Sequence, residues 1–94
     1  MLKINPEYAA PILTLANFLT SSHVPFVLNT HWDGLQMHFP WAANADIVCN
    51  ALSYGHAYGR VESMGCPWDD GDVTSLEVDE AVENIKAWYA KVGA

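Results

Sequence analysis

Apolar residues recur every three or four positions early in the chain, a spacing that predicts an amphipathic helix over about residues 6–21. Asn5 is a favourable N-cap, and Pro6 is favourable in a first helical turn. Pro11 has no amide hydrogen to donate, so either the first turn bends or the regular helix begins nearer Tyr8. The apolar stripe consists of Tyr8, Ile12, Leu15, Ala16 and Leu19.

The spacing changes to alternation between residues 26 and 39, on both sides of Asp33-Gly34. This pattern predicts a β-hairpin with a two-residue turn, in which Trp32 pairs with Leu35. The same register makes His31 and His38 diagonal neighbours on the polar face. We expect the other face to be core, with six apolar side chains: Phe26, Leu28, Trp32, Leu35, Met37 and Phe39.

The rest of the chain predicts two more helices and one or two short strands. Asn44 can cap a helix over about residues 45–54, with Ile47, Val48, Ala51 and Leu52 facing inward. Short strands are expected near residues 60–64 and 73–76, and apolar spacing predicts a last helix over about residues 78–92. The expected fold is therefore α+β, a small antiparallel sheet covered by three helices, in a single domain spanning residues 1–94.

Charge is the feature that bears most on function. Eleven acidic residues stand against four basic ones, and the formal net charge is −7. Seven of the acids lie between Asp69 and Glu83, in a segment between Arg60 and Lys86 that holds no basic residue. Such a chain repels nucleic acid, so we expect no direct nucleic-acid binding. The acidic segment is either a solvated face or a docking surface for a basic protein.

An aromatic residue lies at the start of this acidic segment. Trp68 either anchors a partner as an interface hot spot or folds back to hold its own loop; the other aromatic residues are expected to be mostly core. The predicted partner-binding residues are Trp68, Asp69, Asp70, Asp72, Glu77, Asp79, Glu80 and Glu83.

Catalytic or metal chemistry is the alternative to a docking function. His31, His38, His56 and Glu62 are suitable ligand types, but none lies in a close ligand pair, so we expect no metal and no cofactor. Cys49 and Cys66 follow no Cys-x-x-Cys spacing and are expected to be reduced.

Cys66 also lies beside acidic residues, which raise a thiol pKa and oppose nucleophilic activation. We therefore expect a protein that is not an enzyme; a small metal-dependent or cysteine-dependent enzyme is the alternative. No apolar run is long enough for a bilayer span and no secretory signal is evident, so we expect a cytoplasmic protein without membrane contact.

One stretch resembles small uncharacterised acidic proteins encoded by phages and prophages. It comprises Ser53-Tyr54-Gly55-His56, then Gly59, Glu62, Met64 and Gly65, followed by the acidic segment and the final helix. In size, acidity and layout the chain also resembles phage inhibitors of host defence, such as anti-CRISPR proteins.

This likeness implies an acidic nucleic-acid mimic that docks on a basic host protein, for example a CRISPR effector complex in the host cytoplasm, and inhibits it. A structural module that forms homodimers or larger homo-oligomers is a further alternative.

Overall fold

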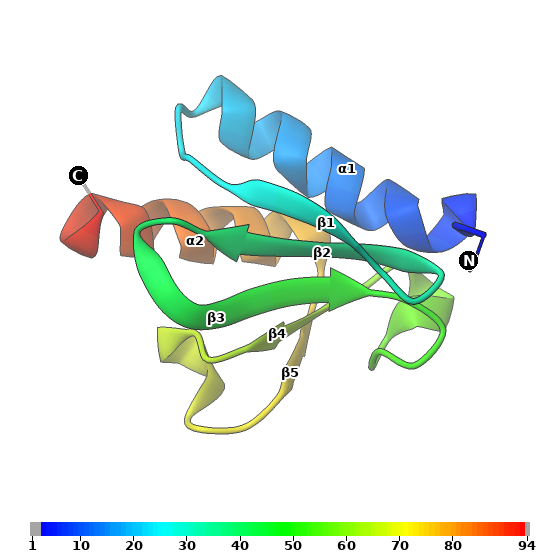
Figure 1. Cartoon of the computed structure of the whole chain (residues 1–94). Helices are drawn as coiled ribbons and strands as arrows, with labels where there is room; N and C mark the ends of the chain where they lie inside the picture. Colours follow the sequence, from blue (N-terminus) through cyan, green and yellow to red (C-terminus); the bar gives the residue numbers. More distant parts are fainter. Residues whose placement is uncertain (1–2, 94) are drawn as a thin grey trace.

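The computed structural model describes residues 3–93 and confirms the α+β class. Five strands form one antiparallel sheet in chain order, and both helices pack on one face of it and against each other (Figure 1). No helix within the described range is long and apolar enough to cross a membrane. In order, the elements are α1 (Pro6–Ser21), β1 (Val27–His31), β2 (Gly34–Phe39), β3 (Ala42–Cys49), η1 (His56–Tyr58), β4 (Val61–Met64), η2 (Pro67–Asp69), β5 (Thr74–Leu76) and α2 (Val78–Val92).

The first helix has the predicted bounds. The Asn5 side chain caps it by accepting a hydrogen bond from the Glu7 amide at 3.0 Å. Pro11 lies inside the helix and is buried, so the alternative in which the regular helix begins nearer Tyr8 is wrong. The missing amide of Pro11 would have bonded the carbonyl of Glu7, an exposed residue in the first turn of the helix.

The hairpin forms, but its register differs from the prediction. Thr30 pairs with Leu35, and Trp32 and Asp33 make the turn. The pairing predicted for Trp32 is therefore wrong, and so is its place in the core, because it is 58% exposed. The register differs by two positions, an even number, so the remaining core side chains keep their face. His38 now lies opposite Val27, and the two histidines are not diagonal neighbours.

Contacts from outside the hairpin explain this register. The Asp33 carbonyl accepts from the Asn5 amide at 2.7 Å, and its Oδ1 accepts from the Ala51 amide at 3.0 Å. Gly34 then enters the strand so close to β3 that a Cβ on it would lie 1.8 Å from the Cys49 carbonyl oxygen. The glycine therefore serves close packing between strands, and Trp32 takes the left-handed conformation of the turn, with φ +56°.

The helix predicted over residues 45–54 is wrong. Residues 42–49 form β3, the central strand, which pairs with β2 on one side and β4 on the other. Asn44 has φ +64° beside a break in the β2–β3 register and does not cap a helix. Ile47 and Val48 are buried as expected, whereas Leu52 is 68% exposed. Pairing on both edges outweighs the helix propensity of the alanines in this segment.

The C-terminal half follows the prediction closely, since β4, β5 and α2 all occur where they were expected. Fully buried side chains from the helices and the sheet meet in one core. They include Leu15, Met37, Ile47, Val61 and Ile85.

Candidate functional site

Five of the predicted partner-binding carboxylates lie exposed on the loop after η2 and on the first half of α2. Glu83 lies 3.8 Å from Lys86, and the other four form no ion pair within residues 3–93. We call this set the acidic surface; it consists of Asp70, Asp72, Asp79, Glu80 and Glu83.

Glu77 is separate from this surface because a basic residue neutralises it. Arg60 donates to its carboxylate at 2.7 Å and also bonds the side chain and backbone of Ser75. Glu80 and Glu77 form a capping box at the start of α2, in which the Glu77 amide donates to Glu80 Oε1 at 3.3 Å. Carboxylates in a first helical turn also interact favourably with the helix dipole. Glu80 therefore stabilises α2 as well as contributing to the acidic surface.

Asp69 does not belong to the surface, contrary to its predicted role. It is 3% exposed, and its carboxylate accepts hydrogen bonds from the Ser63 hydroxyl at 2.5 Å and from the Cys66 amide at 2.8 Å. The hydrogen bond from the Cys66 amide closes the first turn of η2 as a capping box does. Asp69 thus holds η2 in place, and a partner could not contact it directly.

Trp68 folds back onto the protein, which was the second of its two predicted roles. Its indole Nε1 donates to Ser63 Oγ at 2.9 Å. Its ring meets Trp88 edge to face, with ring centroids 5.7 Å apart and an interplanar angle of 88°. The indole is half-buried, so one part of it remains accessible.

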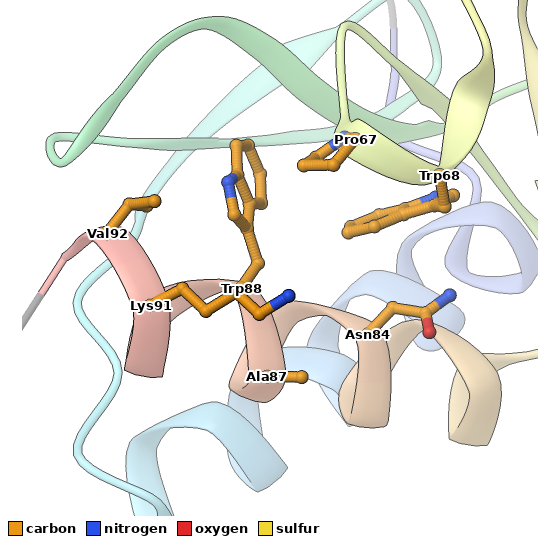
Figure 2. A pocket seen from close by; sticks show the side chains of 7 residues that line it. All are labelled: Pro67, Trp68, Asn84, Ala87, Trp88, Lys91 and Val92. Carbon is orange, nitrogen blue, oxygen red and sulfur yellow. The ribbon is translucent and has the colours of Figure 1, made fainter.

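Beside Trp68 the surface is hollowed into a pocket of about 480 Å³ (Figure 2). Pro67 and Trp68 come from η2, and the remaining lining residues come from α2, between Asn84 and Val92. Figure 2 shows Pro67 and the Trp68 ring on the η2 side of this space. The Trp88 ring and the other lining side chains come from α2 on the opposite side. We call it the aromatic pocket; its lining residues are Pro67, Trp68, Asn84, Ala87, Trp88, Lys91 and Val92.

The wall formed by Trp88 is part of a larger aromatic cluster. Its ring centroid lies 4.9 Å from that of Trp41 and 5.9 Å from that of Phe39. Trp41 is itself fixed, because its Nε1 donates to the Pro25 carbonyl at 2.8 Å. The pocket is therefore preformed against a rigid support.

The sequence held only part of the signal for this pocket. Asn84, Ala87, Trp88 and Lys91 are three or four residues apart, which places them on one side of α2. Nothing in their spacing shows that η2 packs beside that side of the helix. Trp68 was singled out for its place at the start of the acidic segment, whereas its position depends on the hydrogen bond to Ser63.

Both cysteines are free and buried. Burial, together with the nearby carboxylates of Asp69 and Asp46, raises the pKa of the Cys66 thiol to about 12. Burial also raises the pKa of Cys49. Each thiol is therefore protonated at neutral pH, which disfavours a cysteine nucleophile.

The histidines considered as metal ligands lie apart. His31 Nδ1 is 2.9 Å from Asn50 Nδ2, and His56 Nδ1 is 2.6 Å from the Ser53 carbonyl oxygen. His38 lies opposite Asp46 on the neighbouring strand. Within residues 3–93, no three histidine, cysteine, aspartate or glutamate side chains are grouped so as to hold a metal ion.

Comparison of the chain with family models, curated proteins and solved structures found no match.

Besides the aromatic pocket, a second group of apolar side chains is exposed, contrary to the expectation that the aromatic residues are mostly core. Trp32 lies in the β1–β2 turn, and Leu52, Tyr54 and Tyr58 lie in the loop that joins β3 to β4. The Ala51–Asp33 hydrogen bond joins this loop to the turn, at the end of the sheet away from η2 (Figure 1). Turn residues flanking Trp32 and glycines around the tyrosines are the sequence signals for their exposure.

Proposed function

We propose that this protein is a non-enzymatic binding protein whose acidic surface docks on a basic protein. The observation that carries the proposal is the arrangement of Asp70, Asp72, Asp79 and Glu80, which are exposed and have no ion-pair partner among the described residues. Complementary charge across an interface accelerates association and selects the partner. Asp69 and Glu77 are not part of this surface, because Asp69 is hydrogen-bonded to Ser63 and Glu77 is paired with Arg60.

The proposed partner is a nucleic-acid-binding protein or complex of a host cell. Such proteins carry clustered lysine and arginine side chains that neutralise phosphates. An acidic surface on those side chains would displace the nucleic acid, so docking would inhibit the partner. This is the action that the likeness to phage-encoded inhibitors of host defence implies, and its setting would be the host cytoplasm.

A pull-down from bacterial lysate, followed by a competition assay, tests this function. The protein is used as bait at low and high salt, and each captured basic protein is purified and mixed with its own nucleic acid. Addition of this protein is expected to release the nucleic acid in a gel-shift assay. High salt should weaken the interaction because it screens exposed charges.

The decisive variant is the triple change Asp70→Asn, Asp79→Asn and Glu80→Gln. Asparagine tolerates the left-handed conformation of residue 70, which has φ +51°, and glutamine retains the acceptor of the capping box. Glu7→Gln is a matched control for the helix-start glutamate, because Glu7 is an exposed acid in the first turn of α1.

We expect the triple variant to lose the competition and the control to retain it. Equal competition by both variants, or binding that does not change with salt, would show that the acidic surface is only a solvated face.

A further inference from the structure

The aromatic pocket borders the acidic surface. Glu80 precedes Asn84 of the pocket wall by four residues, so the two lie on the same side of α2. Asp70 follows Trp68 of the opposite wall by two residues. A segment of a partner that meets these carboxylates therefore also passes the opening of the pocket.

We infer that the pocket takes one bulky apolar side chain, such as phenylalanine or leucine, from a segment whose basic residues meet the acidic surface; this inference rests on the function proposed above. Five of the seven lining residues present apolar or aromatic surface: Pro67, Trp68, Ala87, Trp88 and Val92. A volume of about 480 Å³ is in the range of sites that bury a ligand.

The charge of the lining excludes a basic side chain as the occupant. Among residues 3–93, no side-chain carboxylate lines the pocket, and Lys91 contributes an ammonium group to it. A lysine or arginine from the partner would lose its hydration there without a counter-charge. Charge complementarity therefore divides the segment: its basic residues meet the acidic surface, and its apolar residue enters the pocket.

The rigidity of the walls favours binding. The indole of Trp68 is fixed by the bond to Ser63, and that of Trp88 is packed against Trp41 and Phe39. Neither wall must become ordered when the pocket is filled, which lowers the entropic cost of binding. Tryptophans in such preformed pockets are typical of interface hot spots.

Two synthetic peptides test the inference. Both have lysines on either side of a central residue, which is phenylalanine in one and alanine in the other. Burial of the phenylalanine ring is expected to make the first peptide bind roughly tenfold more tightly. Affinity is measured by fluorescence titration, and NMR follows the indole N–H signals of Trp68 and Trp88.

A filled-pocket variant and a matched control locate the effect. Ala87→Phe fills the pocket from an exposed helix position, and Ala90→Phe places the same ring on the same helix at an exposed residue outside the lining. We expect Ala87→Phe to bind both peptides equally and Ala90→Phe to retain the phenylalanine preference. Circular dichroism checks that both variants keep the helical content of the wild type.

The possible outcomes separate this inference from the proposed function. If both peptides bind equally to the wild type in a salt-dependent manner, or if Ala87→Phe retains the preference, the pocket inference is wrong and the acidic docking surface stands. If neither peptide binds at low salt, both proposals fail. A preference lost only in Ala87→Phe, together with peptide-induced shifts of the two indole signals, supports the pocket.

Discussion

Replacement of Ser63 by alanine should loosen the wall of the aromatic pocket. Ser63 is fully buried on β4. Its hydroxyl donates to the Asp69 carboxylate at 2.5 Å and accepts from the Trp68 indole at 2.9 Å. One oxygen atom thus joins the buried acid to the tryptophan that forms the pocket.

The magnitude follows from the two hydrogen bonds that disappear. A bond to a charged group contributes roughly 1.5 to 3 kcal/mol, and a neutral one about 1 kcal/mol. Alanine leaves the Asp69 oxygen and the Trp68 N–H without this partner inside a region that excludes much of the water. We expect Ser63→Ala to lower the free energy of unfolding by about 3 kcal/mol, a large share of the stability of a small domain.

Urea unfolding followed by circular dichroism measures this change, and a double-mutant cycle assigns it. In Trp68→Phe the indole donor is absent, so Ser63→Ala then removes only the bond to Asp69. The second substitution should therefore cost about 1 kcal/mol less in the Trp68→Phe background than in the wild type.

Two results would contradict the role assigned to Ser63. A loss below about 1 kcal/mol for Ser63→Ala would mean that water replaces both bonds at little cost. Strict additivity with Trp68→Phe would mean that Ser63 does not hold the indole, so the pocket wall would need another support.

Three further predictions concern the hairpin and the thiols, and urea unfolding measures each of them. Gly34→Ala should destabilise the fold by about 2 kcal/mol or more, because its Cβ would lie 1.8 Å from the Cys49 carbonyl oxygen. Trp32→Asn should stabilise it by about 0.5 to 1 kcal/mol, since asparagine tolerates the observed φ of +56°; a loss would instead favour the register that places Trp32 in the core. The pKa of Cys66 rises from 9.0 to about 12 on folding. The contribution of this thiol to the free energy of unfolding is therefore complete below pH 9 and decreases as the pH rises toward 12. The unfolding free energy should fall by about 1 kcal/mol between pH 9 and 10 on account of this thiol, and Cys66→Ala should flatten that part of the profile; an unchanged slope would contradict the shift.

The elements that could be predicted are those whose pattern is local. Helical spacing and end signals located both helices, because Asn5 caps α1 and the Glu77–Glu80 capping box begins α2. Alternation located β1 and β2 because one face of the hairpin is buried. Their register was not predictable from the Asp-Gly pair, since Asn5 and Ala51 bind Asp33 from elsewhere in the chain.

The central strand shows the opposite case. Alanines and a cap residue favoured a helix over residues 45–54, while the run Ile47, Val48 and Cys49 favoured a strand. The strand is formed because β2 and β4 pair with both of its edges. Ile47, Val48 and Cys49 are all buried, so the end of this strand shows no alternating pattern, and the choice depends on tertiary contacts.

Adjacent carboxylates illustrate why the candidate site was predicted only in part. Asp69 and Asp70 are indistinguishable in charge and type, yet Asp69 is buried and Asp70 is exposed. The turn of η2 directs Asp69 toward Ser63, and the left-handed conformation of Asp70, with φ +51°, ends that turn. A run of acidic residues in a sequence therefore mixes carboxylates that hold the fold with carboxylates that face solvent. Neutralising Asp69 would reduce binding by disturbing the loop, so only variants that spare it, such as Asp70→Asn with Asp79→Asn, can test the acidic surface as an interface.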